Sequence, residues 1–254
     1  MRFQDKRVLI TGAGHGIGLA VARAFISEGG RVAVNDIIPD RVARVVQELG
    51  RRCCAVVGDV ADTEESRSVV SRADAELGGL DIVVSNAGIF PSRAFLEMDI
   101  SDWDRVMAVN IRGTFLICQA AAQLMVKQNQ PGVIVTISSG SARFARVGSA
   151  HYCASKAAVV MLTRVMALEL APYRIRVNSV SPGIIDVPGG QPLSDSYKAA
   201  MTRMVPWGRM GNPEDVANVV LLASDPAVEY ITGQVIAVDG GLSSGRYGIP
   251  VADE

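Results

Sequence analysis

The sequence lacks several features that would place it outside the ordinary globular proteins. Its formal net charge at pH 7 is only −1, so it has no excess of basic residues for a nucleic acid or an anionic membrane surface. No apolar run approaches the ~20 residues that a membrane span needs. The segment Met1–Lys6 has no secretory apolar region, and neither repeats nor low-complexity segments occur. We expect a cytoplasmic protein with no nucleic-acid or membrane partner.

Cysteine is scarce, with four residues in the whole chain, and their spacing matches no metal-binding or redox motif. The adjacent Cys53 and Cys54 are expected to face opposite sides of a strand. We interpret all four, with Cys118 and Cys153, as reduced and mostly buried thiols, and we expect no metal site.

What the sequence does have is a regular alternation of apolar strands and amphipathic helices. At 254 residues, with 49% hydrophobic and 20% charged residues, the chain can bury a full core. Seven predicted strands alternate with six predicted helices and no linker, which predicts a single doubly wound (Rossmann-type) α/β domain over residues 1–254. Its sheet is expected to be mostly parallel and seven-stranded, with helices on both faces. The strands are predicted at 8–10, 31–36, 53–57, 81–85, 133–137, 174–180 and 235–238.

The predicted helices carry recognisable start signals. Asp62 is expected to cap a helix that runs to Leu77, and Ser101 to open a capping box for a long helix through Asn110. Further helices are expected from Ile17, at 41–49, at 152–170, and from Asn212 with Pro213 at its first position.

A glycine- and proline-rich excursion, 181–211, interrupts this rhythm, and its part 187–211 is interpreted as a substrate loop or lid. An apolar cluster in it suits a lid as well as core or subunit packing, with glycines 189, 190 and 211 as hinges. The cluster consists of Met201, Met204, Trp207 and Met210.

The segment Thr11–Gly18, with the sequence T-G-A-G-H-G-I-G, follows the first strand and opens the first helix. A strand, a glycine-rich turn and a helix start form a phosphate-binding corner, because backbone N–H groups point outward there and glycines permit close approach. The strict G-x-G-x-x-G spacing is not met, since Ile17 and Leu19 stand where the last glycine is needed. An ordinary glycine-rich turn is the alternative.

Asp36 ends the second predicted strand, twenty residues after Gly16. A carboxylate at that strand tip can accept hydrogen bonds from both ribose hydroxyls of an adenosine. A 2′-phosphate would meet a like charge, which at ~4 Å and an effective dielectric near 20 costs roughly 4 kcal/mol. The residue therefore predicts NAD rather than NADP, and the alternative is a turn or helix-capping aspartate before Pro39.

Tyr152 and Lys156 form Y-x-x-x-K at the start of a predicted helix, so both side chains lie on one helical face. Lowering a phenol pKa from its usual value near 10 by about two to three units requires roughly 3–4 kcal/mol. One ammonium a few ångströms away supplies about that much. Ser139 ends the preceding strand and can donate to a substrate oxygen, and Asn110 sits inside a helix where asparagine is a weak former. For an isolated Y-x-x-x-K pair, surface packing is the alternative.

Polar and glycine residues follow most of the predicted strands, and ligands of such sheets bind beyond the carboxyl ends of the strands. These residues are Gly12–Gly18, Asp36, Asp59, Asn86–Gly88, Ser138–Ser139 and Pro182–Gly183.

Taken together, these residues resemble the short-chain dehydrogenase/reductase family, in order and along essentially the whole chain. The resemblance implies hydride transfer between a nicotinamide cofactor and an alcohol or carbonyl carbon. It implies Tyr152 as general acid/base, Ser139 as the group that polarises the substrate oxygen, and Asn110 as the holder of a water. Lys156 would lower the Tyr152 pKa and bind the nicotinamide ribose. The motifs are T-G-x-x-x-G-I-G, Asp36, Asp59-Val60, Asn86-Ala87-Gly88, Asn110, Ile137-Ser138-Ser139, Tyr152-x-x-x-Lys156 and Pro182-Gly183.

The resemblance also implies a cofactor-binding set and homotetramers or dimers built from the helices that contain Asn110 and Tyr152. Asp59 would contact the adenine, and Asn86–Gly88 would support the adenosine ribose. The set comprises Gly12, His15, Gly16, Ile17, Gly18, Asp36, Asp59, Val60, Asn86, Ala87, Gly88, Tyr152, Lys156, Pro182, Gly183 and Ile185.

Two departures from the family pattern matter. Val187 stands where the family usually has Thr, so the nicotinamide carboxamide would have to rely on backbone near Ile185. His15 occupies a turn in which NADP-using members often place Arg or Lys, which fits NAD.

Three functions stay open. The first is an NAD-dependent dehydrogenase of a secondary alcohol, such as a polyol, sugar or hydroxy compound. The second is an NADPH-dependent 3-oxoacyl-carrier-protein reductase, against which Asp36 argues. The third is a nucleotide-binding regulator without turnover.

Two small groups of residues allow further interpretations. A hydrolase triad of Ser139, His151 and Asp186 is disfavoured, because Ser139 lacks the G-x-S-x-G elbow. Arg143 and Arg146 could contact a carboxylate or phosphate, or could form a solvated loop face.

Overall fold

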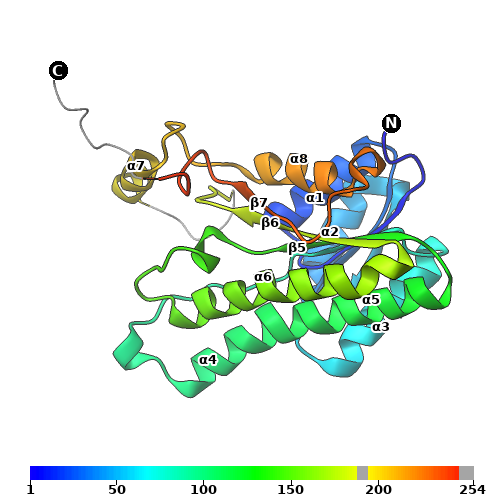
Figure 1. Ribbon diagram of the computed structural model, residues 1–254, viewed down its shortest axis with the longest axis horizontal. Helices are drawn as coiled ribbons and strands as arrows, with labels where there is room; N and C mark the ends of the chain where they lie inside the picture. Colours follow the sequence, from blue (N-terminus) through cyan, green and yellow to red (C-terminus); the bar gives the residue numbers. More distant parts are fainter. Residues whose placement is uncertain (188–193, 246–254) are drawn as a thin grey trace.

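One seven-stranded sheet organises the chain in the computed structural model, which describes residues 1–187 and 194–245 (Figure 1). All neighbouring strands are parallel, in the order β3-β2-β1-β4-β5-β6-β7. The order reverses between β1 and β4, so their carboxyl ends flank the crevice in which such sheets bind ligands. The strands are β1 Arg7–Ile10, β2 Arg31–Asp36, β3 Cys53–Val57, β4 Ile82–Ser85, β5 Gly132–Ile137, β6 Ile175–Pro182 and β7 Val235–Val238.

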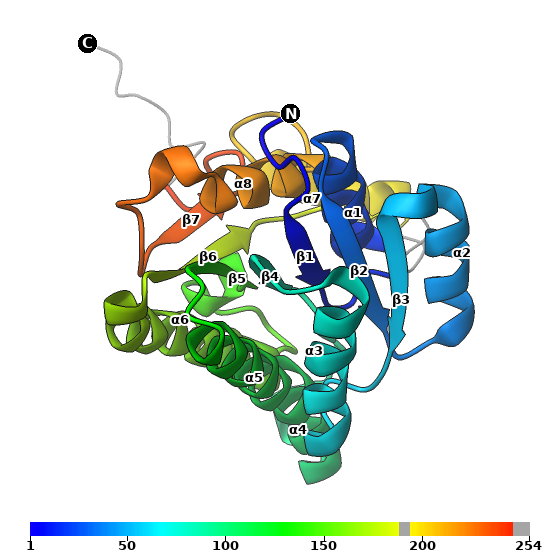
Figure 2. The same ribbon diagram turned by 90° about the vertical axis from the view of Figure 1, so that its right-hand side faces the viewer.

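Helices cover both faces of the sheet, as Figure 2 shows with α3, α5 and α6 on one side and α1 and α8 on the other. Side chains alternate along each strand, so Val8 and Ile10 join the core under α1 and α8 while Leu9 joins the core under α3 and α5. Burial on both faces explains why the strands are nearly continuous apolar runs. The expected opposite facing of Cys53 and Cys54 is confirmed, because they pack into different cores.

The helices begin close to their predicted starts where a capping signal is strong. Asp62 accepts hydrogen bonds from the N–H groups of Glu64 and Glu65, and Asn212 forms a capping box with Asp215. No described helix is long and apolar enough to cross a membrane. The helices are α1 Gly16–Ser27, α2 Pro39–Leu49, α3 Thr63–Leu77, α4 Ile100–Met107, α5 Thr114–Lys127, α6 Ala150–Leu170, α7 Asp195–Met204 and α8 Pro213–Ser224.

The predicted capping box at Ser101 is wrong. Helix α4 already begins at Ile100, because the carbonyl of Asp99 accepts a hydrogen bond from the N–H of Trp103 at 3.2 Å. Asp99 is the N-cap residue by backbone geometry, although its side chain makes no capping hydrogen bond.

The prediction of six helices also needs two changes. The long helix is divided, because residues Ala108–Gly113 form a π-helical segment between α4 and α5. A further helix, α7, lies within the excursion 181–211, for which the sequence predicts no helix. The Ser194 hydroxyl accepts from the N–H of Tyr197 at 3.2 Å at its start.

Candidate active site

The glycine-rich turn is joined to the end of β4 by a small hydrogen-bond network. The hydroxyl oxygen of Thr11 accepts from the backbone N–H groups of Asn86 and Ala87, at 3.0 and 3.1 Å. The Asn86 amide donates in return to the carbonyls of Thr11 and Gly12, at 2.9 and 3.1 Å. The turn after β1 and the turn after β4 therefore hold one another in place.

The turn requires glycine for steric reasons. Gly12 has φ +62°, and a methyl group there would lie 2.8 Å from the Cα of Ala87. A methyl group on Gly14 would lie 2.5 Å from Asp36 Oδ2, and one on Gly18 would collide with the carbonyl of Gly12.

The first turn of α1 keeps its N–H groups without a side-chain cap, since the N-cap residue His15 makes no capping hydrogen bond. A glycine cradle that faces such a helix start is suited to a pyrophosphate. The residues present therefore fit a dinucleotide.

Asp36 lies at the carboxyl end of β2 and is 5% exposed. Its carboxylate accepts from the N–H groups of Gly14 and Ile38, at 3.2 and 3.0 Å, and His15 Nδ1 lies 4.0 Å from Asp36 Oδ2. The bond to Ile38 makes Asp36 a turn aspartate as well, so the structural alternative for this residue is also correct. Its negative charge stands beside the glycine turn.

Asp59 and Val60 follow β3 in a tightly bonded loop. The Asp59 carboxylate accepts from the N–H of Ala61 at 2.8 Å, and its own N–H donates to Glu65 at 2.7 Å. Asn35 joins this loop to β2, because its amide donates to the carbonyl of Gly58 at 3.0 Å.

Three predicted catalytic residues meet around the end of β4. A methyl group on Gly88 would lie 3.3 Å from Asn110 Oδ1 and 3.4 Å from Lys156 Nζ. The Lys156 ammonium donates to the carbonyl of Ile137 at 2.8 Å and lies 5.8 Å from the ring centroid of Tyr152. The helical spacing of Tyr152 and Lys156 thus does bring ammonium and phenol ring to one site.

Asn110 lies in the π-helical segment and is completely buried. Its side chain accepts from the N–H of Ile89 at 2.8 Å and donates to the carbonyl of Ile89 at 2.9 Å and to the hydroxyl of Ser155 at 3.1 Å. The asparagine therefore joins the loop after β4 to α6, and its implied role in holding a water stays a prediction.

The protonation of the site differs from the simple electrostatic expectation. Burial raises the pKa of Tyr152, while the neighbouring Ser139 hydroxyl and the charge of Arg146 lower it by less. Burial also lowers the pKa of Lys156 to about 8. The Lys156 ammonium donates its hydrogen bond to the Ile137 carbonyl rather than to the phenol. In the chain alone the phenol is therefore neutral at pH 7.

Ser139 lies beside this pair at the end of β5, 9% exposed, and its Oγ accepts from the N–H of Ser141 at 3.1 Å. Phe90, from the loop after β4, packs its ring edge-to-face with Tyr152 at a centroid distance of 6.2 Å. The phenol thus has Ser139 as a polar neighbour and Phe90 as an apolar one.

The segment after β6 lies over the glycine turn. The N–H of Gly183, after Pro182, donates to Val238 at 2.9 Å, and Ile185 pairs with Gly211. A methyl group on Gly16 would lie 3.0 Å from a methyl of Val187, so the residue that replaces the usual Thr does face the cofactor cradle. The hinge candidates Gly189 and Gly190 lie outside the described residues.

The apolar cluster of the excursion is not core, because Met204 and Trp207 are 51% and 75% exposed. Both the lid and the subunit-packing interpretation remain compatible with that exposure.

The structure does not assemble the hydrolase triad. His151 is fully buried, and its Nδ1 accepts from the N–H of Tyr152 at 2.8 Å. Asp186 is paired with Lys198 at 2.9 Å, and neither it nor Ser139 is hydrogen-bonded to His151. His151 is therefore a helix-start residue.

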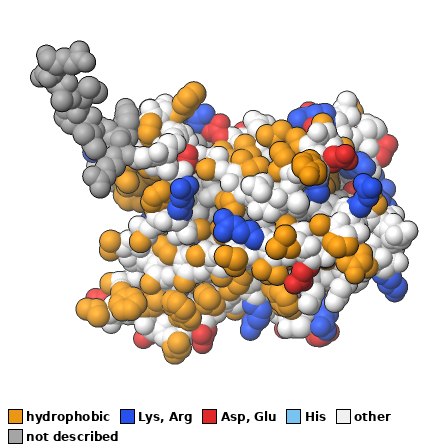
Figure 3. All heavy atoms as spheres, viewed as in Figure 1, with side chains coloured by type: hydrophobic (Ala, Val, Ile, Leu, Met, Phe, Trp, Pro, Cys, Tyr) orange, Lys and Arg blue, Asp and Glu red, His pale blue; other side chains and the backbone are white. Residues whose placement is uncertain are grey.

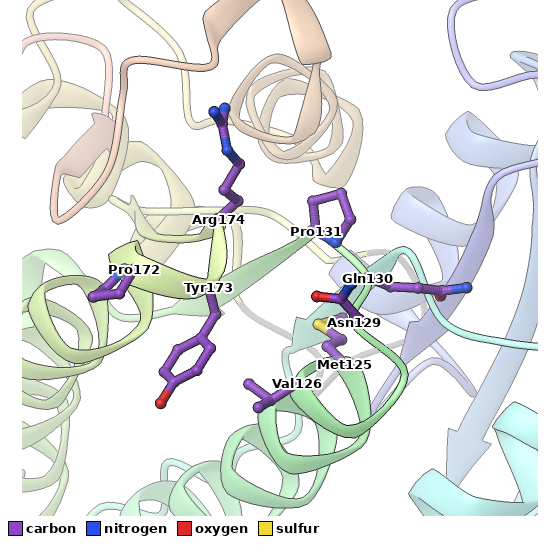
Figure 4. A pocket seen from close by; sticks show the side chains of 8 residues that line it. All are labelled: Met125, Val126, Asn129, Gln130, Pro131, Pro172, Tyr173 and Arg174. Atoms are coloured by element: carbon purple, nitrogen blue, oxygen red, sulfur yellow. The ribbon is translucent and has the colours of Figure 1, made fainter.

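Hollows on the described surface include one near the site and one far from it. One opens beside Ser139, between the segment after β5, helix α6 and strand β7, and it is bordered by Arg143 and Arg164. Figure 4 shows the other, lined by Tyr173 and Arg174 among others, where β5 and β6 begin. This hollow lies at the amino ends of β5 and β6, whereas the predicted site residues lie beyond the carboxyl ends of the strands. Among residues 1–187 and 194–245 no group of three His, Cys, Asp or Glu side chains could hold a metal ion.

The sequence analysis missed two structural partners of the site. These partners are Thr11, which begins the glycine motif, and Ser155 in helix α6. A hydroxyl directly before the first glycine is a local signal for Thr11, whereas the bond between Ser155 and Asn110 spans 45 residues and has no local signal.

Comparisons with known proteins agree with this geometry. A family model described as enoyl-(acyl carrier protein) reductase matches residues 12–243. The chain is 38% identical to a 3-oxoacyl-acyl-carrier-protein reductase FabG of Thermotoga maritima, over 95% of this chain and 99% of the relative. It is 42% identical to an L-rhamnose 1-dehydrogenase (NAD(P)(+)) of a Sphingomonas species, over 94% and 96%. A crystal structure of a short-chain type dehydrogenase/reductase from Mycobacterium marinum superposes with a TM-score of 0.91 at 41% identity, covering 96% of this chain and 97% of that one.

The buried Lys156 leads to a prediction about stability and pH. Its pKa is about 8 in the folded chain against an ordinary 10.5, so the unfolded chain binds more protons between these values. The free energy of unfolding should therefore rise with pH in that window, by at most about 3 kcal/mol. Lys156→Met should abolish this rise, as measured by urea unfolding at pH 7, 8, 9 and 10.

The other titrating groups, including the cysteines and Tyr152, are present in both proteins and drop out of the difference. Lys127→Met, at the exposed end of α5, serves as the control and should keep the wild-type pH dependence. A stability difference between wild type and Lys156→Met that stays constant with pH would contradict the prediction.

Proposed function

The chain belongs to the short-chain dehydrogenase/reductase family, and we propose that it is an NAD-dependent dehydrogenase of a secondary alcohol, interconverting a polyol, sugar or other hydroxy compound with its ketone. Family membership makes it an oxidoreductase. The observation that carries the proposal is the meeting of Tyr152, Lys156 and Asn110 around Gly88, with Ser139 at the end of the next strand.

The same edge of the sheet would hold the cofactor. The glycine turn and the start of α1 would bind the pyrophosphate, Asp36 the adenosine ribose, and Asp59 with Val60 the adenine. Pro182, Gly183 and Ile185 would meet the nicotinamide end through backbone groups, because Val187 has no hydroxyl. A bound nicotinamide dinucleotide supplies the acceptor or donor of the hydride.

The chain's own groups would handle the substrate oxygen and its proton. The Ser139 hydroxyl would donate a hydrogen bond to that oxygen, and Tyr152 Oη would take the carbinol proton during oxidation and return it during reduction. Lys156, with a pKa of about 8, can exchange a proton near neutral pH. A phenol whose pKa is raised by burial needs such a cationic neighbour to work as a base.

The preference for NAD rests on Asp36. Its carboxylate is nearly buried and fixed by two backbone N–H groups beside the cradle, so it cannot swing away from a 2′-phosphate without losing both bonds. Repulsion of the second negative charge follows.

An NADPH-dependent 3-oxoacyl-carrier-protein reductase is the alternative, and the similarity to the Thermotoga maritima reductase favours it. Asp36 argues against it. The third possibility, a regulator without turnover, is opposed by the complete set of Asn110, Ser139, Tyr152 and Lys156.

Several further features belong to the same proposal. The chain would act as one domain, with 187–211 as a lid over the substrate. A cytoplasmic location is supported by four cysteines that are all free thiols. The assembly would be a homotetramer or dimer built on the helices that contain Asn110 and Tyr152, which are the helical segment from α4 to α5 and helix α6.

The proposed function predicts oxidation of secondary alcohols with NAD, followed by absorbance at 340 nm on a panel of polyols, sugars and hydroxy compounds. Tyr152→Phe should lower kcat by about 10²- to 10⁴-fold, because the proton acceptor is removed. Tyr173→Phe, in the 3-10 turn that follows α6, should leave kcat unchanged. Undiminished oxidation by Tyr152→Phe would sink the proposal, and faster NADPH turnover of oxoacyl thioesters would favour the alternative. Cofactor binding without turnover would favour the regulator.

The role of Asp36 predicts a change of cofactor preference. Asp36→Asn keeps the shape but removes the charge, so the ratio of kcat/KM for NADP to that for NAD should rise about 10- to 100-fold. Asp40→Asn, an exposed acid in the first turn of α2, should not change it. A wild type that prefers NADP, or an unchanged ratio in Asp36→Asn, would contradict this role.

The oligomer predicts an interface on the exposed apolar face of α6. Met161, Val165 and Leu168 lie one helical turn apart and are 56%, 43% and 79% exposed. Light scattering should show a mass above that of one chain, and Leu168→Glu should lower it. Leu96→Glu, at a leucine outside these helices that is still more exposed, should not. A monomeric wild type would disprove the assembly.

A further inference from the structure

The segment that leads from Ser139 into Tyr152 carries two exposed arginines, and the structure separates their surroundings. Arg143 stacks on the ring of Phe144, 5.8 Å from its centroid, and borders the hollow on the β7 side. Arg146 instead lies beside helix α7, with its Nη2 3.5 Å from the hydroxyl of Tyr197. Figure 1 shows α7 and this segment at the same end of the molecule.

Helix α7 is fixed near the site by a second contact. Asp186, just after β6, pairs with Lys198 at 2.9 Å, next to Tyr197 in sequence. The loop before α6, the loop after β6 and α7 therefore meet at the border of the site, where the exposed Arg146 guanidinium lies beside Tyr197.

The charge of Arg146 reaches the catalytic phenol. It is among the groups that lower the pKa of Tyr152, whereas Arg143 is not. Within residues 1–187 and 194–245 no carboxylate lies within 4.0 Å of the Arg146 guanidinium, and Asp186 is already neutralised by Lys198. The intervening residues 188–193 have the sequence P-G-G-Q-P-L, which contains no acid. Arg146 is thus a cation that faces the site with its hydrogen-bonding fork uncommitted to an acid of the described chain.

We propose that Arg146 binds an anionic group of the substrate, so that the substrate is an anionic secondary alcohol such as a hydroxy acid or a hydroxyalkyl phosphate. This rests on the proposed function, and it assigns the reacting carbinol to Ser139 and Tyr152 and the anion to Arg146, oriented by Tyr197. Arg146 is then a specificity-determining residue.

The chemistry of the guanidinium supports an anion over a neutral group. Its planar fork matches the two oxygens of a carboxylate or phosphate, and such charge-assisted pairs are roughly twice as strong as neutral hydrogen bonds. A neutral alcohol gains nothing comparable at this position. Phe90, which packs against the Tyr152 ring, offers only apolar contact.

The test compares matched probes that differ only in the anion. The pairs are 3-hydroxybutyrate with its methyl ester, and glycerol 3-phosphate with glycerol, so the two arms distinguish carboxylate from phosphate. Wild type should prefer the anionic member of at least one pair. Arg146→Gln should lower kcat/KM for that member about 10- to 100-fold, mostly through KM, and leave its neutral partner nearly unchanged.

Three further variants sharpen the result. Arg67→Gln, an exposed arginine on α3 that does not line the hollow beside Ser139, should behave as wild type. Tyr197→Phe should raise KM for the anionic member by a smaller factor, because the guanidinium loses its orienting hydroxyl. Arg146→Lys keeps the charge without the fork and should recover part of the loss, which also covers the case in which Arg146→Gln folds poorly.

The outcomes separate this inference from the proposed function. Equal kcat/KM for anionic and neutral members, or an equal loss on both in Arg146→Gln, overturns the inference while the dehydrogenase stands. If no alcohol is oxidised, the proposed function fails, and calorimetric titration with butyrate and with butanamide then decides the anion site alone. Binding of butyrate that is weakened in Arg146→Gln supports the site, and butyrate binding no better than butanamide overturns it.

Discussion

The joint between the turns after β1 and β4 is the contact on which the site depends. Thr11 accepts two N–H groups from Asn86 and Ala87, and the Asn86 amide holds the two carbonyls that begin the glycine turn. The next residue along the chain, Gly88, packs against both Asn110 and Lys156. The turn proposed to hold the dinucleotide and the residues proposed for proton transfer are therefore parts of one hydrogen-bonded unit, and a shift in either turn would move both.

Within that unit, burying the charged Lys156 costs free energy of folding. An ammonium with 5% of its residue surface exposed loses hydration, and a single carbonyl, that of Ile137, compensates only part of it. The lowered pKa expresses this uncompensated part. The same burial that destabilises the charged form brings the pKa of Lys156 close to neutral pH. Burial therefore lowers the stability of the fold and at the same time lets Lys156 exchange a proton near neutral pH.

Much of the fold and of the cofactor end could be predicted from the sequence, because local signals specify them. The start of α3 at Asp62 and that of α8 at Asn212 follow from side chains that bond within three residues of themselves. The placement of Asp36 follows from the strand that it ends. The predicted capping box at Ser101 is wrong, because the backbone of Asp99 begins α4 earlier.

The π-helical segment around Asn110 depends on partners that no short sequence window contains. Asn110 bonds to Ile89 and Ser155, which are 21 and 45 residues away. The protonation of Tyr152 also depends on the whole fold, because burial raises the pKa of its phenol.

The substrate end resists sequence analysis for the same physical reason. It is shaped by bonds between segments that are distant in the chain, such as the N–H of Arg93 with the carbonyl of Gly148 at 2.9 Å and Arg146 with Tyr197. None of these partners has a fixed spacing, so no motif can encode them.

Phe90, Phe95 and Leu96 in the segment after β4, and Ile100 at the start of α4, are exposed apolar residues. Figure 3, in the view of Figure 1, shows a broad hydrophobic area at the end of the molecule where α4 lies. Local motifs therefore determine the proposed cofactor end, whereas contacts between loops determine the shape of the proposed substrate end. A change of substrate would then require new partners between loops and no change in the glycine turn.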